Sequence, residues 1–544
     1  MSVYSVRPEL LPLARTIVLE CAKRKTLTEE RLKKIRNNLT RDNGGILPKN
    51  LELIQAYNTL IEEGKIKPAP HILKVIQKRK VRTLSGIANI TVLTKDLGCP
   101  GKCIFCPTEK GMPKSYLSNE PAMMRAVRNE FNAYKQTKTR LNGLVAQGHD
   151  VSKIDVRTAG GTWGAVPEWY RQRFLKGIFL ALNEGPGTFL DEKTLEQTIQ
   201  NSTLDDLIAH NETAACRCVG LWVETRPDWV DAEELKKLRS YGVTGIELGV
   251  QTTDDAVNEF NVRGHGLRES IEATKLCRDI GLKVCHHLMP NLPTATKKSD
   301  LKSGRDLFDL EGLRPDYLKI YPTMVTPYSD LEKMVAKDPT IHTPYTDDEL
   351  IEIIADLKGR VPEYCRIIRI IRDIPAESII LGSKKSNLRQ IMERMGVRCR
   401  CVRCREIQDL SFKIKDLKLS IKEYRANEGD EFFISLDEPK LDKLVGLCRL
   451  RFPSDSKHPL FPELRDAAIV RELHVYGRKR SLTGDGLSSK TQHLGLGKRL
   501  MAEAERISKH AGFPRLAVIA AIGTREYYKK LGYQLEGTYM TKNL

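Results

Sequence analysis

The sequence predicts an α/β protein of several domains: a basic helical N-terminal domain, a partial (β/α)6 barrel, a linker with a cysteine cluster, and a second α/β unit. Three observations predict this organisation. The 544 residues suit about three or four domains of roughly 100–200 residues each. Short β-rich runs alternate with helical stretches after residue 88, as in parallel βα units. An apolar content of 40% is sufficient for substantial cores.

Residues 1–88 are predicted to form the basic helical domain. Residues 1–80 contain 17 Lys and Arg against 8 Asp and Glu, in a chain of net charge +19 and pI near 9.3. This excess favours a polyanionic partner, most often nucleic acid, with general solubility as the alternative. In the helical stretch "RLKKIRNN", the residues expected to contact phosphates are Lys33, Lys34 and Arg36.

Residues 89–330 are predicted to form the barrel. Its strand candidates are 88–94, 153–161, 218–227, 245–251, 283–290 and 317–324. Each run ends in polar, Gly or Pro residues, and barrels of this kind place their chemistry at the carboxyl ends of the strands. We therefore expect the barrel's site at these ends.

A compact cysteine cluster, "LGCPGKCIFCPTEKG", follows the first strand candidate and contains Cys99, Cys103 and Cys106 in the spacing C-x3-C-x2-C. A disulfide framework is disfavoured in a reducing compartment, and structural zinc usually needs four protein ligands. Three thiolates on a four-iron cluster leave one iron open to bind a small molecule. The spacing and its place after the strand resemble the radical S-adenosylmethionine (SAM) superfamily, which implies a [4Fe-4S] cluster and SAM.

The same resemblance implies further SAM-binding residues along the barrel, namely Gly160, Gly161 and Thr162 in "AGGT", Glu224 in "VETRPD", Gln251 in "GVQ" and Arg263 in "NVRGH". The alternatives are a simple turn for the glycines and barrel-mouth salt bridges for the charged residues. Lys319, on the sixth strand candidate, is a candidate catalytic residue, with a satisfied ion pair as its alternative role.

Residues 331–410 are less regular and are predicted to be a linker. Their segment "GVRCRCVRCREI" contains Cys399, Cys401 and Cys404. Thiolates this close together favour a soft metal, and we predict structural zinc. Cys365 or a histidine could supply the fourth ligand, and the alternative is a set of reactive thiols activated by the neighbouring arginines.

Residues 411–544 are predicted to form the second α/β unit. "QHLGLGKRL" follows the strand candidate "AAIVRELHVYG" and opens an amphipathic helix, whose N-terminal N–H groups suit phosphate binding. This order resembles the GNAT acyltransferases. The resemblance implies acetyl-CoA contacts by Glu472, Leu473, His474, Gln492, His493, Leu494, Gly495, Leu496, Gly497, Lys498 and Tyr527. Tyr527 and Tyr528 are candidates for a place near the thioester sulfur, with core packing as the alternative for one of them.

The combination of the two units, with stretches such as "ETRPDW", "VRGHG", "RCRCVRCREI" and "RELHVYG", resembles the family of the catalytic third subunit of Elongator, in an archaeal or bacterial form. The resemblance implies C5 carboxymethylation of the wobble uridine of tRNA, bound through its anticodon stem-loop. A SAM-derived radical would take hydrogen from the methyl group of acetyl-CoA, the carbon radical would add to C5, and hydrolysis would release CoA. A reductant for the cluster is implied as well.

Three other functions stay open from the sequence. One is a protein lysine acetyltransferase with Glu472 as general base, the second is a non-catalytic RNA-binding scaffold, and the third is another radical-SAM tRNA modifier such as a methylthiotransferase. No membrane span or signal peptide is recognisable, so we expect a cytoplasmic protein. We also expect the SAM and acetyl-CoA sites to share a cleft, and the sequence makes no prediction of an oligomeric state.

Overall fold

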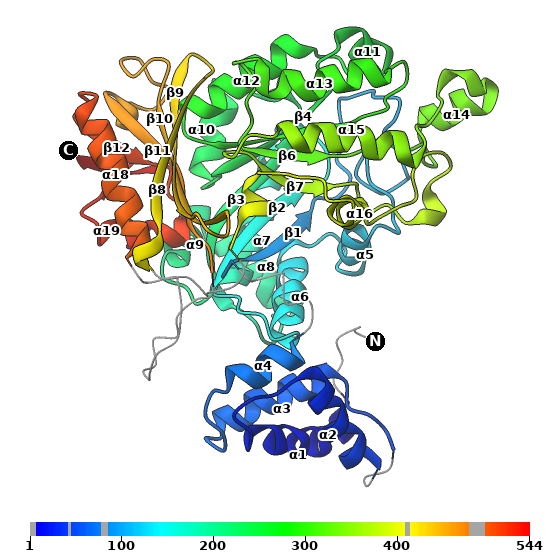
Figure 1. Cartoon of the computed structure of the whole chain (residues 1–544), viewed down its shortest axis with the longest axis vertical. Helices are drawn as coiled ribbons and strands as arrows, with labels where there is room; N and C mark the ends of the chain where they lie inside the picture. Colours follow the sequence, from blue (N-terminus) through cyan, green and yellow to red (C-terminus); the bar gives the residue numbers. More distant parts are fainter. Residues whose placement is uncertain (1–6, 42–44, 78–84, 408–413, 478–494) are drawn as a thin grey trace.

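The computed structural model describes residues 7–41, 45–77, 85–407, 414–477 and 495–544. A helical bundle, an open barrel of parallel strands and a second sheet follow one another along the chain (Figure 1). Within the described ranges, no helix is both long enough and apolar enough to cross a bilayer.

The N-terminal domain is helical, as predicted. A short 3-10 turn, Pro8–Leu10, leads into α1 (Leu11–Ala22), α2 (Glu29–Arg41), α3 (Asn50–Glu62) and α4 (Pro70–Ile76). Ile17, Leu53 and Leu60 are fully buried in the core of this bundle. The Gln77 side chain joins it to the barrel, because its amide donates to the Gly148 carbonyl at 3.0 Å. Figure 1 shows the bundle as a separate body beneath α6.

The first sheet has seven parallel strands in sequential order. They are β1 (Ala88–Leu93), β2 (Lys153–Ala159), β3 (Arg217–Thr225), β4 (Gly245–Gln251), β5 (Lys283–Leu288), β6 (Tyr317–Ile320) and β7 (Arg366–Ile370). The six predicted strands are confirmed, and β7 is added from a segment that we expected to be linker. The run "RIIRI" of β7 has arginines at both of its polar positions, so it lacks the continuous apolar run typical of a buried parallel strand.

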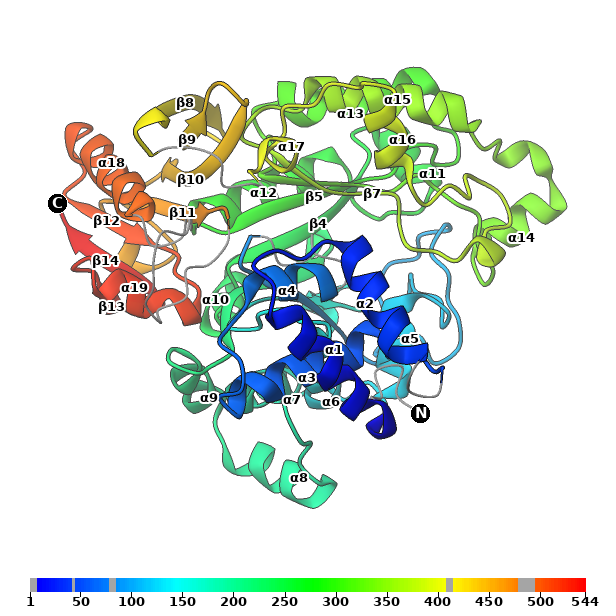
Figure 2. The same cartoon turned by 60° about the horizontal axis from the view of Figure 1, so that its bottom comes forward.

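Helices cover the outer face of this sheet (Figures 1 and 2). Between α7 and the strands, Leu175, Ile178 and Phe179 are fully buried in the largest apolar core. The described helices between β1 and the second sheet, not all of which lie on this face, are α5 (Pro121–Arg128), α6 (Ala133–Ala146), α7 (Glu168–Glu184), α8 (Glu192–Asn201), α9 (Leu204–Asn211), α10 (Ala232–Ser240), α11 (Asp255–Phe260), α12 (Leu267–Asp279), α13 (Lys297–Asp309), α14 (Asp330–Lys337), α15 (Asp347–Arg360), α16 (Leu388–Arg394) and α17 (Val402–Arg405).

The second sheet is mostly antiparallel, in the order β13-β14-β12-β11-β10-β9-β8. Only β11 and β12 pair in parallel, and they are joined through α18 (Leu496–His510). The strands are β8 (Lys418–Ala426), β9 (Gly429–Glu438), β10 (Lys443–Phe452), β11 (Ala467–Val475), β12 (Arg515–Val518), β13 (Gln534–Glu536) and β14 (Tyr539–Asn543), with α19 (Arg525–Lys529) before β13.

Buried charges join the two sheets. Asp316, directly before β6, is 0% exposed and pairs with Arg471 of β11 at 2.6 Å and with Arg449 of β10 at 3.5 Å. Glu431 of β9 also pairs with Arg471, at 2.8 Å, and with Arg278 of α12, at 3.0 Å. Both views show β9–β11 alongside α10 and α12 (Figures 1 and 2). The barrel and the second sheet are therefore fixed against each other.

Candidate active site

One continuous cavity of about 2430 Å³ lies between the two sheets. The volume is larger than the roughly 300–1,000 Å³ of a pocket for one small ligand. Apart from Gly160, the residues predicted for the barrel's site line the same cavity as the described residues predicted for the second unit, as the expected shared cleft requires. Among its lining residues are Cys99, Cys103, Cys106, Gly161, Thr162, Glu224, Gln251, Arg263, Lys319, Glu472, Leu473, His474, Gly495, Leu496, Gly497, Lys498, Tyr527 and Tyr528.

The first cysteine cluster forms a loop after β1. The Cys103 sulfur accepts a hydrogen bond from Arg263 Nη1 at 3.1 Å, and the Cys99 sulfur lies 3.4 Å from the Thr162 hydroxyl. The thiol of Cys106 hydrogen-bonds to Cys103 and, together with the Arg263 charge, outweighs burial and lowers the pKa of Cys103 to about 5. Cys103 is therefore a thiolate at neutral pH, which is the form that binds metal.

The surroundings of this loop fit a bound cluster with a polar ligand beside it. Arg226 Nη1, Arg263 Nε and Gln251 Oε1 are buried and have no hydrogen-bond partner within the described part of the chain. A Cβ at Gly101 would lie 2.5 Å from Arg226 Nη1. Only the second cysteine group brings three described ligand atoms within 4.8 Å of one another. The sulfurs of Cys99, Cys103 and Cys106 do not gather as closely as a set, and this arrangement suits a polynuclear cluster, in which each thiolate binds a different iron.

The glycines after β2 shape the next wall of the cavity. Gly160 has φ +133°, a conformation that L-residues rarely adopt, and a Cβ there would overlap the Thr94 hydroxyl. Gly161 has φ +105° and brings the backbone to the edge of the cysteine loop, where a Cβ would lie 3.9 Å from Cys99 Cβ. The two glycines therefore do more than form a turn, because they allow close backbone approach.

Polar side chains from β3, β4 and β5 complete this end of the cavity. Glu224 accepts a hydrogen bond from the Tyr116 hydroxyl at 3.2 Å and lies 3.9 Å from His287 Nδ1. Gln251 has φ +68° at the end of β4. Arg263 bonds to Cys103 and to the Gly249 carbonyl, and forms no ion pair with a carboxylate of the described residues.

Lys319 lines the cavity and also forms an ion pair. The two alternatives considered from the sequence, a place in the site and an ion pair, are therefore compatible. The partner of Lys319 is Glu247, which also pairs with Arg157 and accepts from His287 Nε2 at 3.0 Å. Burial opposes ionisation of Glu247, but the charges of Lys319 and Arg157 outweigh it and hold the pKa of Glu247 well below its ordinary value. Lys319 therefore sits in the site as a fixed positive charge.

On the opposite wall, α18 begins at the glycines of the predicted acetyl-CoA motif. Gly495 caps the helix with φ +77°, and a Cβ on Gly497 would lie 2.6 Å from the Tyr527 hydroxyl. Tyr527 is 37% exposed, whereas Tyr528 is 5% exposed and belongs to the apolar core. Gln492, His493 and Leu494 lie outside the described residues.

Glu472 of β11 points toward the barrel. It accepts from the Tyr317 hydroxyl and from Arg449 Nε, the latter at 2.7 Å. Burial raises its pKa, but Arg449, Lys283 and these hydrogen bonds together lower it below its ordinary value. A carboxylate held in this way is a weak proton acceptor. Its neighbour His474 also lines the cavity, and burial lowers the pKa of His474 to about 4, so the imidazole is neutral.

Comparison with known proteins identifies the families to which the two domains belong. Family models match residues 197–302 (Radical SAM superfamily), 315–395 (Radical_SAM C-terminal domain) and 402–533 (Acetyltransferase (GNAT) family). The chain is 39% identical to a protein named tRNA uridine(34) acetyltransferase from Methanocaldococcus jannaschii, over 97% of this chain and 96% of that protein. The chain belongs to the Elp3 family of tRNA uridine(34) acetyltransferases.

Other members of the Elp3 family agree. A tRNA uridine(34) acetyltransferase from Dehalococcoides mccartyi is 41% identical over 86% of this chain and 100% of that protein. Elongator complex protein 3 from Danio rerio is 36% identical, and 86% of each chain is aligned. The solved structure of the archaeal Methanocaldococcus infernus Elp3 with an N-terminal deletion of residues 1–46 has a TM-score of 0.72 at 35% identity, covering 85% of this chain and 100% of that chain.

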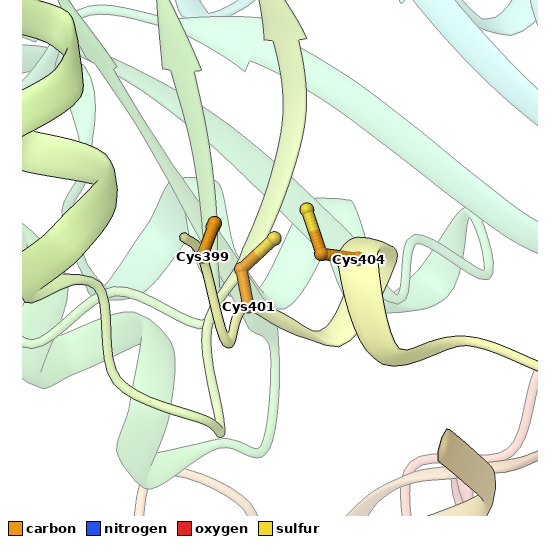
Figure 3. Close-up of side chains that lie close together, drawn as sticks. All are labelled: Cys399, Cys401 and Cys404. Atoms are coloured by element: carbon orange, nitrogen blue, oxygen red, sulfur yellow. The ribbon is translucent and has the colours of Figure 1, made fainter. Parts of the chain in front are cut away.

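The second cysteine cluster of this Elp3-family chain lies on another part of the cavity wall. The sulfurs of Cys399, Cys401 and Cys404 lie within 4.8 Å of one another (Figure 3). Cys401 accepts hydrogen bonds from both other thiols, which lower its pKa. These three thiols fit a single ion. Among the residues that the structure describes, neither Cys365 nor a histidine joins them, so the predicted fourth ligand is not found there.

The predicted phosphate contacts of α2 differ in their surroundings. Lys33 is exposed, and Lys34 is 76% exposed with only a loose pair to Glu30 at 3.7 Å. Arg36 is half-buried and donates to Asn50 Oδ1 at 3.2 Å, so it packs α2 against α3. The two lysines are accessible to a polyanion, and Arg36 is largely structural.

Sequence reasoning missed several polar residues that line the barrel interior. Arg157, His287 and Tyr317 lie on β2, β5 and β6 and connect the two ends of the cavity through Glu247 and Glu472. Polar side chains at alternate positions within otherwise apolar strands were the signal, because those positions face the barrel interior.

Proposed function

We propose that this protein modifies uridine 34 of tRNA at C5, using SAM, a [4Fe-4S] cluster and acetyl-CoA to leave a carboxymethyl group. The single observation that carries the proposal is the shared cavity, which is lined both by the cysteine loop of the barrel and by the start of α18. The names of the relatives support uridine 34 as the target. The domain boundaries at residues 88 and 410 are part of this proposal, whereas the barrel sheet continues past the predicted boundary at residue 330 to β7.

In the barrel, Cys99, Cys103 and Cys106 would hold the cluster, and its open iron would hold SAM. When bound, this pair supplies the one-electron chemistry needed to take hydrogen from an unactivated methyl group. SAM would approach the backbone closely at Gly160, Gly161 and Thr162, because the two glycines have no Cβ. Arg263 and Gln251 offer buried, unpartnered polar atoms, and the remaining SAM contact that we propose is Glu224.

In the second unit, the N–H groups at the start of α18 would bind the CoA phosphates, because a helix N-terminus favours anions. The acetyl-CoA contacts that we propose are residues 472–474 and 492–498, with Tyr527. Burial raises the pKa of Tyr527 to about 12, so its hydroxyl stays protonated and can donate to the thioester sulfur. Lys319 would face the acetyl group from the barrel side.

Lys and Arg outnumber Asp and Glu by about two to one along the cavity, which supports RNA as the second substrate. The anticodon stem-loop would bring an unstacked uridine into the cavity, and Lys33 and Lys34 would contact the RNA further out. A separate reductant would supply electrons to the cluster. A single metal ion such as zinc would occupy the second cysteine group.

Protein lysine acetylation is less well supported. Its general base would have to be Glu472, which is already bound by Tyr317 and Arg449 and has a lowered pKa. Proton transfer requires a base whose pKa lies near the working pH. The carboxylate of Glu472 instead connects the second sheet to the barrel.

The test is anaerobic reconstitution of the cluster, followed by addition of dithionite, SAM, acetyl-CoA and unmodified tRNA. Nucleoside mass spectrometry should detect carboxymethyluridine at position 34. Cys103→Ser should abolish the product and leave tRNA binding nearly unchanged, because the cluster is lost and the basic surfaces remain. Acetylation of protein lysines in the absence of any modified nucleoside would refute the proposal.

A further inference from the structure

Three arginines beside the second cysteine group line the cavity without a carboxylate partner among the described residues. We call Arg389, Arg398 and Arg403 the three-arginine wall. Arg389 donates to the Ile367 carbonyl at 3.2 Å and Arg403 to the Ile368 carbonyl at 2.9 Å. Arg398 is exposed. Each guanidinium therefore keeps most of its five donors and its full charge for another group.

The other arginines in this part of the cavity are neutralised. Arg366 pairs with Glu406 at 2.6 Å, Arg369 with Asp373 at 2.7 Å, and Arg372 with Glu120 at 2.9 Å. In contrast, Arg403 forms no ion pair with a carboxylate of the described residues; burial and the charges of Arg389 and Arg366 oppose its own charge, and only the more weakly acting Glu406 and Cys401 favour it. Like charges that lie close together are stabilised when an anion binds between them.

The second cysteine group holds these arginines in place. The Cys401 sulfur accepts from the Ile367 backbone N–H, and the Val402 N–H donates to the Cys365 carbonyl at 2.9 Å. The cysteine loop thus lies along β7, the edge strand of the barrel, where the pairing with β6 shifts by one residue. On its other side, Lys443 of β10 donates to the Cys404 carbonyl at 3.0 Å. The loop is therefore anchored to both sheets.

We propose that the three-arginine wall binds the phosphates of the substrate RNA strand inside the cavity, and that the second cysteine group orders this wall. Guanidinium groups suit phosphate because their planar fork can donate two parallel hydrogen bonds. The wall lines the same cavity as the cysteine loop of the barrel and the start of α18, so an RNA strand held there could place its base between the two cofactor sites. The inference rests on the proposed function for the identity of the RNA, and it adds a role for the cysteine group.

The test measures binding of unmodified tRNA by fluorescence anisotropy over a range of salt concentrations, without SAM or acetyl-CoA. Arg389→Gln and Arg403→Gln should each weaken binding roughly tenfold at low salt. Each should also reduce the slope of log K against log salt by about 0.7–0.9, the contribution of one phosphate contact. Arg403→Lys should restore the salt slope, because it keeps the charge, and only part of the affinity, because an ammonium group cannot donate two parallel hydrogen bonds.

The matched control is Arg400→Gln, which removes the same charge from the same loop. Arg400 pairs with Glu363 at 2.8 Å and with Asp442 at 3.0 Å, and it is not among the residues that line the cavity. The tRNA affinity of Arg400→Gln should stay within about twofold of that of the parent protein, and its slope of log K against log salt should be unchanged. Thermal unfolding of all variants shows whether the folded state is retained, and Cys401→Ser should weaken binding as the arginine variants do.

Equal effects of the Arg400 and Arg403 variants, or no effect of either, would overturn the inference. A rise in KM for acetyl-CoA without loss of tRNA affinity would also overturn it, because the wall would then bind the CoA phosphates. The binding assay needs no chemistry, so these outcomes are independent of the proposed function. If the parent protein makes no modified uridine but the arginine variants bind tRNA more weakly, the proposed function is wrong and the role of the three-arginine wall in binding phosphate is supported.

Discussion

Replacing Asp316 by Asn should weaken the connection between the two sheets. Asp316 is 0% exposed and pairs with Arg471, Arg449 and, at 3.8 Å, Arg278. The amide keeps the size of the side chain but removes the charge that balances these guanidinium groups. Leaving a buried charge without its partner costs about 3–5 kcal/mol. At about 2–4 °C per kcal/mol for a unit of 150–250 residues, the unfolding midpoint should fall by about 6–20 °C.

The assay is differential scanning calorimetry of the parent protein and two variants. The control is Asp373→Asn, which breaks the pair with Arg369, where the carboxylate is 59% exposed. Exposed pairs contribute about 0–1 kcal/mol, so the control should shift the midpoint by at most about 4 °C. If Asp316→Asn lowers the midpoint no more than this control, the buried ion network does not connect the sheets as we argue.

The same network predicts a pH dependence. Burial raises the pKa of Asp316, but Arg471, Arg278 and Arg449 outweigh it and hold the pKa well below its ordinary value. A carboxylate with a lowered folded-state pKa contributes stability above its unfolded-state pKa of about 3.9 and loses it as the pH falls. The midpoint difference between parent and Asp316→Asn should therefore be constant from pH 7 to pH 5 and shrink below about pH 4. A difference that shrinks already between pH 7 and pH 5 would contradict this assignment.

Four further predictions concern the ligand sites. Gly160→Ala should weaken SAM binding at least tenfold by calorimetry, because a Cβ there overlaps a neighbouring threonine hydroxyl; unchanged affinity would place SAM elsewhere. Tyr527→Phe should lower kcat by about tenfold with KM for acetyl-CoA unchanged, since only the hydroxyl is lost. Charge reversal of Lys33 and Lys34 should weaken tRNA binding and flatten its salt dependence, and no effect would exclude α2 as a contact. Metal analysis should find one zinc per chain, lost in Cys401→Ser.

Local patterns predicted most of this fold, whereas long-range pairs could not be predicted. The six barrel strands were recognisable because each is a short apolar run between helical stretches. The seventh, Arg366–Ile370, was missed because its arginines interrupt that run, and one of them bonds to Glu406, 40 residues away. The cysteine and glycine motifs were likewise readable as local spacings. The pairing of Tyr317 with Glu472 joins residues 155 apart in sequence. Such a pair depends on how the two domains pack, and local residue spacing does not predict it.

The rigid connection of the two sheets has a consequence for how the reaction proceeds. Asp316 and Glu431 are at most 1% exposed and bind arginines from both domains. Opening the barrel away from the second sheet would therefore break several buried ion pairs. We therefore expect the reacting groups to meet inside the cavity without separation of the two sheets. A volume of about 2430 Å³ is sufficient for two cofactor-sized ligands and a nucleotide, if each pocket takes roughly 300–1,000 Å³. We infer that the acetyl group and the uridine move into the cavity, and that the two domains keep their positions throughout.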